Sequence, residues 1–304
     1  MGVMGDERDG VFVESFLYVL HLICPAFGRH CAVHDGGAAL AHAKAISAPN
    51  ASAWKRTAPT HPLMKLTDTQ FRIAARLNLG LQPFSHTGDL PDSCPLCRRE
   101  DAIANDPWHL LSCNSQTGAE ITTRHNAVVD ALYHAVLIMG GQAVREPKGL
   151  HVEDGRRPDL QVVFPGRHVL TDVVVSHPLS SARLRRAAGG SAAVARELQQ
   201  RKRKKYSETA TRHEALLLPF SVETCGGMAP DAITLLDTIS EAGKEHLSLW
   251  SHAQIVQHML CSVAIAIQKG NAMAMLSAYS AAVVRASAAV VEAGGENGGR
   301  EEWV

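Results

Sequence analysis

The chain has no net charge, because its 30 lysine and arginine residues balance 30 aspartate and glutamate residues. The balance excludes a general attraction to nucleic acid, so any such affinity has to come from local basic patches. Evenly paired cysteines are also lacking. Seven cysteines with uneven spacing argue against a disulfide framework and favour a reducing compartment and metal ligation.

Signals for secretion or membrane anchoring are equally scarce. Acidic residues open the chain, and Glu14 interrupts the apolar run that follows them, which argues against a secretory signal. Asp6 stands where a myristoylation signal needs a hydroxyl. No uninterrupted apolar span has the length of a membrane helix. We therefore expect an intracellular protein with no membrane partner.

The 304 residues, 46% of them hydrophobic, can bury a substantial core and predict two modules. We divide the chain into an N-terminal segment of unclear structure (1–50), a helical segment with a cysteine-rich knuckle (51–118), an α/β domain with C-terminal helices (119–292) and a flexible tail (293–304).

Periodicity and turn residues predict the order of elements. The predicted elements are a helix over 66–79, a helix over 119–139, three short strands over 142–175, a basic helix over 192–214, a strand over 216–222, and two or three alanine-rich helices broken near Gly270-Asn271. From residue 119 on, this order is typical of an α/β sandwich with a mixed sheet.

Two aspartates flank a predicted hairpin. The Pro165-Gly166 pair separates two β-branched runs, which is a hairpin signal. If Phe164 pairs with Arg167, Asp159 and Asp172 lie opposite one another, with Cβ atoms about 5 Å apart. The other face then gathers the apolar residues, namely Leu160, Val162, Phe164, Val169, Val173 and Val175.

Two carboxylates this close favour a bound proton or a divalent cation, and hard oxygen ligands suit Mg²⁺. A three-residue loop would instead slip the register by one and put Asp172 on the opposite face from Asp159. The alternative is that both acids simply end ordinary strands.

A second signal is the spacing Cys94-x2-Cys97, followed after eleven residues by His109-x3-Cys113. Three thiolates and one imidazole make the closed tetrahedral shell of a structural zinc site. We expect His109 and Cys113 to share one face of a helix, four residues apart. A buried cluster of cysteine and histidine without metal is the alternative.

The densest positive charge is the run Arg201, Lys202, Arg203, Lys204, Lys205, followed by Tyr206. Helical periodicity places Val194, Leu198, Lys202 and Lys205 on one stripe. We expect Lys205 to point inward with Lys202 beside it, and the other basic residues to point outward, where they would contact nucleic-acid phosphates. A solvated helix face and a nuclear localisation patch are alternatives.

In this order the pieces resemble the C-terminal region of non-LTR retrotransposon polyproteins that carry a restriction-like endonuclease. The resemblance covers roughly residues 50–290. Its motifs are the four cysteine and histidine residues of the knuckle, the basic pair Arg124-His125, Pro158-Asp159 with Asp172 as the two acids of a PD-(D/E)XK nuclease core, Lys202, Lys205 and Tyr206 as Lys-x-x-Lys-Tyr, and Pro219 to Thr224 with Gly226-Gly227 as the last core strand and its exit.

The resemblance implies a restriction-endonuclease-like core and a Mg²⁺-dependent DNA endonuclease. Asp159, Asp172 and the Val173 carbonyl would hold Mg²⁺, and Lys205, or Lys202 in its place, would stabilise the transition state. DNA, with the element's RNA as a further candidate, would be the partner, and the nucleus the location. Residues that would position DNA are Arg124, Arg201, Arg203 and Lys204, with Tyr206 packing or contacting phosphate.

Two features depart from the family. Val174 stands where the general nuclease pattern has its lysine, which the retroelement family moves to the following helix. No aromatic-Ala-Asp-Asp polymerase motif occurs, so we expect a C-terminal piece, a truncated element or a separate reading frame that does not polymerise DNA. Three functions stay open: an endonuclease, a catalytically inactive zinc-knuckle remnant that binds nucleic acid, and an α/β protein with a zinc staple and no nucleic-acid role.

Overall fold

The structure is a computed structural model. It describes residues 36–58, 61–84, 93–106, 108–113, 115, 119–150, 157–247 and 249–295. Most of the N-terminal segment and of the C-terminal tail therefore lies outside the described residues. The helices are α3 (Gly36–Ile46), η1 (Ala53–Arg56), η2 (Pro62–Met64), α4 (Asp68–Asn78), α5 (Ala102–Asn105), η4 (His109–Leu111), α6 (Ala119–Ile138), α7 (Leu184–Ala188), α8 (Ala193–Arg212), α9 (Pro230–Ala242) and α10 (His252–Gly295).

The described strands form a mixed α/β fold with two sheets. The strands are β1 (Gln142–Arg145), β2 (Leu160–Phe164), β3 (Arg167–Thr171), β4 (Val173–Ser176), β5 (Leu216–Leu217) and β6 (Phe220–Glu223). The larger sheet has the order β1-β2-β3-β5, and β4 pairs with β6 in the smaller one. β1, β2 and β3 are antiparallel neighbours, whereas the β3–β5 and β4–β6 pairs are parallel.

Two segments that were each predicted as one strand contribute a strand to both sheets, so the structure has more strands than the sequence predicts. The run predicted as one strand after the hairpin breaks at Asp172 into β3 and β4, and the run 216–222 breaks into β5 and β6 at Leu218-Pro219. Pro219 has no N–H to donate to a ladder. Backbone hydrogen bonds still connect the two segments across the break, from Leu218 to Leu170 (3.0 Å) and from Phe220 to Asp172 (3.0 Å).

The hairpin has the predicted two-residue loop. Phe164 pairs with Arg167 and Leu160 with Thr171. Gly166 has φ +69°, which a residue without Cβ adopts at little cost. The predicted apolar face is buried from Leu160 to Val173, and only Val175 is partly exposed.

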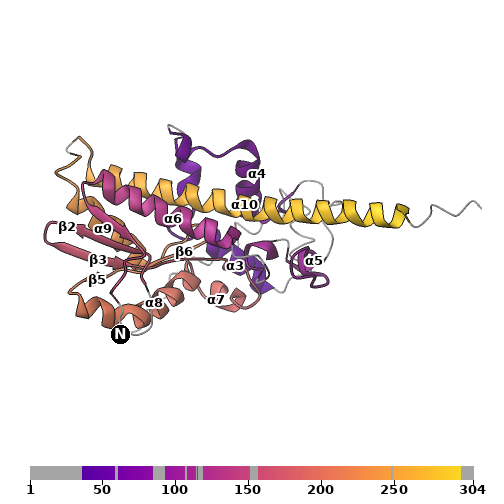
Figure 1. Ribbon diagram of the computed structural model, residues 1–304, viewed down its shortest axis with the longest axis horizontal. Coiled ribbons are helices and arrows are strands. Elements are labelled where there is room, and N and C mark those ends of the chain that lie inside the picture. Colours follow the sequence, from indigo (N-terminus) through magenta and orange to yellow (C-terminus); the bar gives the residue numbers. More distant parts are fainter. Residues whose placement is uncertain are drawn as a thin grey trace, which may run out of the picture.

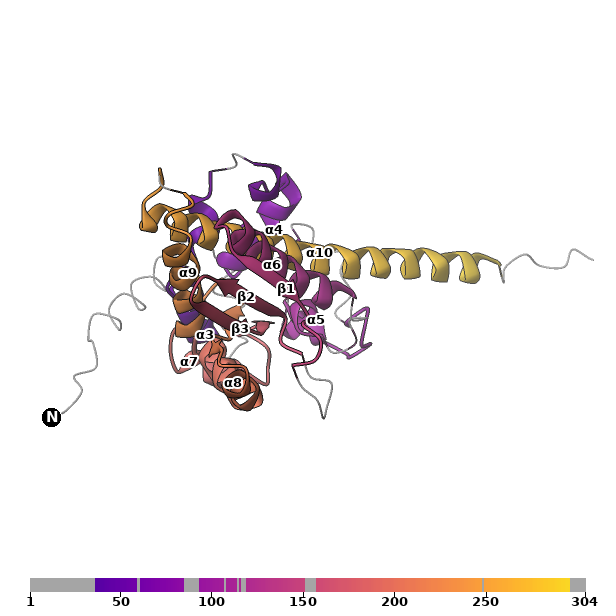
Figure 2. The ribbon, with the colours of Figure 1, turned by 60° about the vertical axis from the view of Figure 1, so that its left-hand side comes forward.

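Helices cover both faces of the strands (Figures 1 and 2). On one side α6, α9 and α10 pack over a large core that includes Leu132, Phe164, Phe220 and Leu235. On the other side α8 packs on β4, β5 and β6. The expected inward stripe of this helix is confirmed for Val194 and Leu198, which are both buried. The acid-bearing ends of β2 and β3 thereby lie between α6 and α8.

The C-terminal helix is continuous where a break was expected. α10 runs through Gly270-Asn271 from His252 to Gly295, and the helix extends well past the rest of the described chain (Figure 1). A Cβ at Gly270 would lie 2.6 Å from Cβ of Arg124 on α6. The glycine therefore serves close helix packing and does not end the helix.

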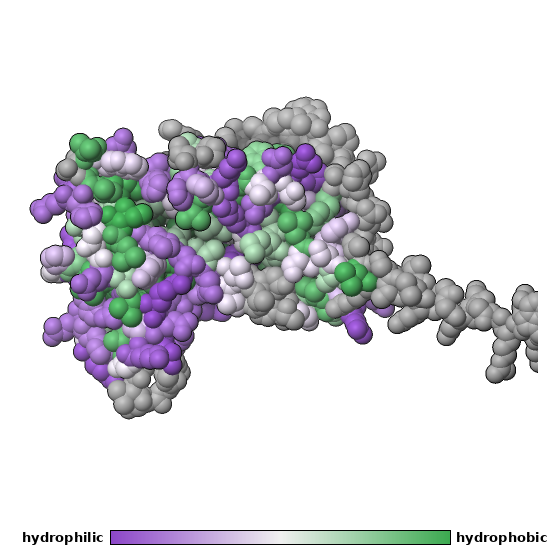
Figure 3. Space-filling view, turned by 45° about the horizontal axis from the view of Figure 1, so that its top comes forward, coloured by the Kyte–Doolittle hydropathy of each residue, from purple (hydrophilic) through white to green (hydrophobic). Residues whose placement is uncertain are grey.

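By length and composition, one stretch of α10 could cross a membrane, contrary to the sequence-based expectation. The stretch is His252–Ala281, and 72% of its most apolar window is buried inside the protein. Burial of this kind is typical of a core helix. On the face shown in Figure 3, hydrophobic residues gather in patches that hydrophilic residues flank.

A second, smaller core joins the cysteine-rich segment to α4 and α10. Its members include Ile73 and Leu77 of α4, Leu110 and Leu111 of η4, and Met275 of α10. The predicted helix over 66–79 is confirmed as α4, with Thr67 and Gln70 forming a reciprocal capping box. Because α10 contributes to both cores, it connects the cysteine-rich segment to the sheet.

Candidate functional site

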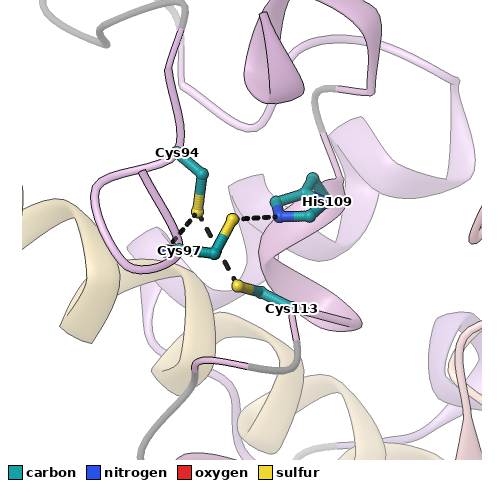
Figure 4. A group of neighbouring side chains, drawn as sticks. All are labelled: Cys94, Cys97, His109 and Cys113. Carbon is teal, nitrogen blue, oxygen red and sulfur yellow. Dashed lines mark hydrogen bonds between the residues drawn. The ribbon is translucent and has the colours of Figure 1, made fainter. Parts of the chain in front are cut away.

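Cys94, Cys97, His109 and Cys113 lie together, as the sequence predicts (Figure 4). Their ligand atoms all fall within 4.8 Å of one another. The Sγ atoms of Cys94 and Cys113 are 3.7 Å apart, and Cys97 Sγ is 3.4 Å from His109 Nε2. Zinc bonds to sulfur and nitrogen of about 2.3 and 2.0 Å at tetrahedral angles predict separations of about 3.8 and 3.6 Å. The four residues could therefore hold a zinc ion.

A tight turn presents the first two thiols. The backbone N–H of Arg98 donates to the Cys94 carbonyl (2.9 Å), and the N–H of Cys94 donates to the Arg99 carbonyl (3.0 Å). Arg98 adopts φ +58° to close this turn. The N–H groups of Leu96 and Cys97 point at Cys94 Sγ (3.4 and 3.5 Å), which favours a thiolate at that position.

The second half of the cluster differs from the prediction. His109 begins the 3-10 helix η4, which ends at Leu111, so Cys113 lies beyond the helix and not on its face. Burial, together with the neighbouring Cys94, raises the pKa of the Cys113 thiol to about 12. A thiol that resists ionisation in this setting needs a cation to displace its proton.

The two acids lie at the same end of the hairpin. Asp159 directly precedes β2, and Asp172 is the residue between β3 and β4. Both line a pocket of about 440 Å³ between α6, α8 and the strand ends. Burial raises the pKa of Asp172, and the nearby charge of Asp159 raises it as well. The predicted juxtaposition of the two acids is therefore present.

Asp159 is held by two donors that join it to neighbouring elements. Its Oδ2 accepts a hydrogen bond from the backbone N–H of Val173 (2.6 Å) and lies 3.1 Å from Nε2 of His125 on α6. The hydrogen bond to Asp159 is the main reason that the pKa of His125 is raised. The sequence indicates a basic pair at Arg124-His125 but no role for His125, because the contact between α6 and the start of β2 is a tertiary one that spacing does not show.

Lys202 and Lys205 exchange the places expected of them. Lys202 makes an ion pair with Oδ2 of Asp172 and is only 25% exposed in its side chain. Lys205 is exposed, and its Nζ donates to the Tyr206 hydroxyl (2.6 Å). The prediction that Lys205 points inward is therefore wrong, although both lysines line the pocket. The smaller exposure of Lys202 follows from its position one turn nearer to the buried Leu198.

Tyr206 is an interior residue and not a surface contact for phosphate. Its side chain is 1% exposed, and its hydroxyl donates to the Arg157 carbonyl (2.8 Å). Burial raises the pKa of Asp172, and the neighbouring Tyr206 hydroxyl acts in the opposite direction. Tyr206 thus forms part of the pocket wall, and its ring is packed in the protein interior.

The residues predicted to contact DNA differ in their exposure and in whether they form ion pairs within the protein. Arg124 is 2% exposed and lies in the interior, so the prediction that it contacts DNA is wrong. Arg203 forms two hydrogen bonds of 2.6 Å with the carboxylate of the buried Asp231, and Arg201 pairs with Glu197 (2.5 Å). Lys204 is exposed.

Positive charge extends beyond the predicted basic run. Residues 183–205, which form α7 and most of α8, carry nine basic side chains and one acidic one. The outer side of these helices includes exposed Arg185, Arg196 and Lys204. In a chain without net charge, this layer is a concentrated basic surface beside the pocket.

No family model matches the chain, and no curated protein is significantly similar to it. A cluster of three cysteines and one histidine, a mixed α/β fold and a pocket with two acids are the features on which a function can be argued.

Proposed function

We propose that the protein is a divalent-cation-dependent DNA endonuclease whose active site is the pocket at the end of β2 and β3. One observation carries the proposal: Asp159 and Asp172 share this pocket with His125, Lys202 and Lys205. Paired carboxylates can hold the divalent cation of metal-dependent phosphodiester hydrolysis, and a lysine beside them can stabilise the developing negative charge. The resemblance of the motif order to retroelement endonucleases agrees with this assignment.

The acids have the chemistry to bind Mg²⁺. Both are hard oxygen donors, and the buried Oδ2 of Asp172 receives no well-aligned hydrogen bond among the described residues, although Lys202 pairs with it. Both hydrogen bonds described for Asp159 end on Oδ2, which leaves Oδ1 to face a cation. Bound Mg²⁺ would neutralise charge on the phosphoryl oxygens and make a water more acidic.

The lysines and the histidine act around the acids. With a cation beside Asp172, the Lys202 ammonium no longer has to neutralise that carboxylate and can turn to the scissile phosphate, where it stabilises developing negative charge. Lys205, at the rim, contacts a neighbouring phosphate. His125 and the Val173 N–H fix the orientation of Asp159.

DNA is the partner that the charge distribution favours. The basic layer formed by α7 and α8 continues from the pocket along a helix of 20 residues, which is about 30 Å long. A duplex presents a phosphate about every 1.7 Å of its axis. The exposed residues Arg185, Arg196 and Lys204 would contact such a backbone without reading its sequence.

Plasmid nicking tests the proposal. Supercoiled plasmid is incubated with Mg²⁺ and either the unchanged protein, Asp159→Ala or Asp130→Ala. Asp130 is an acid of α6 that pairs with Arg145 outside the pocket. We expect nicking by the unchanged protein and by Asp130→Ala, and a loss of at least about hundredfold in Asp159→Ala.

The same samples are examined by gel shift with duplex DNA. Equal nicking in all three proteins would point to a contaminant, and binding without nicking would leave a nucleic-acid-binding remnant. Either result would overturn the assignment as an enzyme.

A further inference from the structure

Arg124 is a buried arginine for which the proposed chemistry has no use. It lies in the second turn of α6, and burial lowers the pKa of its guanidinium to about 10. No carboxylate of the described chain forms an ion pair with it, and its Nε has no hydrogen-bond partner there. Burying a cation without a paired acid costs folding free energy, so the remaining contacts of Arg124 have to offset that cost.

These contacts join three separate parts of the chain. Nη2 of Arg124 donates to the Leu111 carbonyl (3.3 Å), and Nη1 donates to Oδ1 of Asn271 on α10 (3.2 Å). Asn271 in turn donates to the carbonyl of Thr224, directly after β6 (2.9 Å). The arginine lies against Gly270, where a Cβ would come within 2.6 Å of its side chain. The glycine therefore gives Arg124 room to pass α10.

Both ends of this connection are chemically relevant. Leu111 is the last residue of η4, two residues after His109 and two before Cys113, so its carbonyl belongs to the segment that carries half of the Cys3His cluster. On α6 the residue after Arg124 is His125, whose imidazole reaches Asp159 in the acidic pocket. Arg124 thus lies between the candidate zinc ligands and the candidate catalytic acids and connects the segments that carry them.

We infer that Arg124 is a positioning residue that couples the Cys3His cluster to the acidic pocket. A zinc ion in the cluster fixes the Leu111 carbonyl, this carbonyl fixes Arg124, and Arg124 sets the position of the first turns of α6, which carry His125. Coupling of this kind is reciprocal, so a change at Arg124 alters both zinc affinity and the order of the pocket. This inference rests on the proposed function only for the catalytic role of the pocket.

The experiment compares the unchanged protein with Arg124→Met, Arg124→Lys and the control Arg167→Met. Arg167 is an exposed arginine that pairs with Glu241, and its described side-chain contacts involve neither site. Zinc affinity is measured by competition with a chromogenic chelator. Order in the pocket is measured as hydrogen–deuterium exchange of the Val173 amide, which donates to Asp159, with and without zinc.

We expect Arg124→Met to weaken zinc binding about ten- to hundredfold, as is typical when a group supporting a metal site is lost. Arg124→Lys keeps the charge and one donor, so it should recover part of the loss, and Arg167→Met should bind zinc normally. Removing zinc should speed exchange of the Val173 amide in the unchanged protein, and should change it little in Arg124→Met, where the connection is already broken.

Unchanged zinc affinity in Arg124→Met would overturn the inference, as would a Val173 amide that does not respond to zinc in the unchanged protein. If Arg124→Met does not fold, Arg124→Lys decides by the same two measurements. Neither measurement uses DNA cleavage, so a protein that fails to nick plasmid refutes the proposed function and leaves the coupling open to its own test.

Discussion

Removal of the Lys202 ammonium should destabilise the protein in a pH-dependent way. Lys202 pairs with Asp172, whose side chain is 5% exposed. Burial and the charge of Asp159 raise the pKa of Asp172, and Lys202 opposes both. In Lys202→Met the carboxylate stays buried beside another acid without its cation. Breaking a fully buried pair costs about 3–5 kcal/mol. Because Lys202 is a quarter exposed, we expect about 2–4 kcal/mol at pH 8.

The sign of the pH effect follows from linkage. Without Lys202 the pKa of Asp172 in the folded state lies still further above its usual value, so the folded state binds a proton more readily than the unfolded state does. Stability of the variant then falls as the pH rises through that raised pKa, and the loss shrinks toward acid pH as Asp172 takes up a proton.

Urea unfolding at pH 5 and pH 8, followed by circular dichroism, measures the effect. Lys204→Met removes an exposed neighbour and should change the free energy of unfolding by no more than about 0.5 kcal/mol. Adding Asp172→Asn to Lys202→Met should recover most of the loss at pH 8. The reasoning would be refuted by an equal loss at both pH values, or by a double variant no more stable than Lys202→Met.

Two further predictions concern α6 and its neighbours. The hydrogen bond to Asp159 raises the pKa of His125 above 6.5. Protonated His125 therefore stabilises the fold below that value, and this contribution is lost as the pH rises through the folded pKa. His125→Gln should flatten the change in melting temperature between pH 5.5 and 8, and an unaltered profile would contradict the assignment. Gly270→Ala should destabilise the protein by about 1–3 kcal/mol in the same unfolding assay, because the added Cβ meets Arg124. Gly37→Ala, where nothing lies within 4 Å, should instead be neutral or stabilising by up to about 1 kcal/mol, and similar losses in both variants would show that the close approach to Arg124 does not matter.

Local signals predicted the elements that local chemistry controls. The capping box of Thr67 and Gln70 begins α4 where it was expected, and Pro165-Gly166 closes the two-residue hairpin with Phe164 opposite Arg167. Both depend on interactions within a few residues, which the sequence displays directly. The same holds for the Cys94–Cys97 pair, because its turn is formed within the knuckle itself.

Predictions that depended on packing were less successful. Periodicity put Lys202 and Lys205 on one stripe, but only the position of α8 against β4 and β6 decides which lysine meets Asp172. Gly270-Asn271 looks like a helix break in sequence, and it becomes a crossing point once Arg124 packs there. The same packing turns Arg124 from an expected DNA contact into an interior residue.

Spacing and turn residues in the sequence are enough to single out four residues with zinc-ligand spacing, two acids that flank a hairpin, and a basic helix. How these features are connected follows from the packing of the folded chain. This packing brought His125 to Asp159 across 34 positions and Arg124 to Asn271 across 147. The physical reason is that spacing and periodicity report on a single element, whereas the contacts of an ionisable side chain are set by burial against elements distant in the chain, which change the cost of its charge.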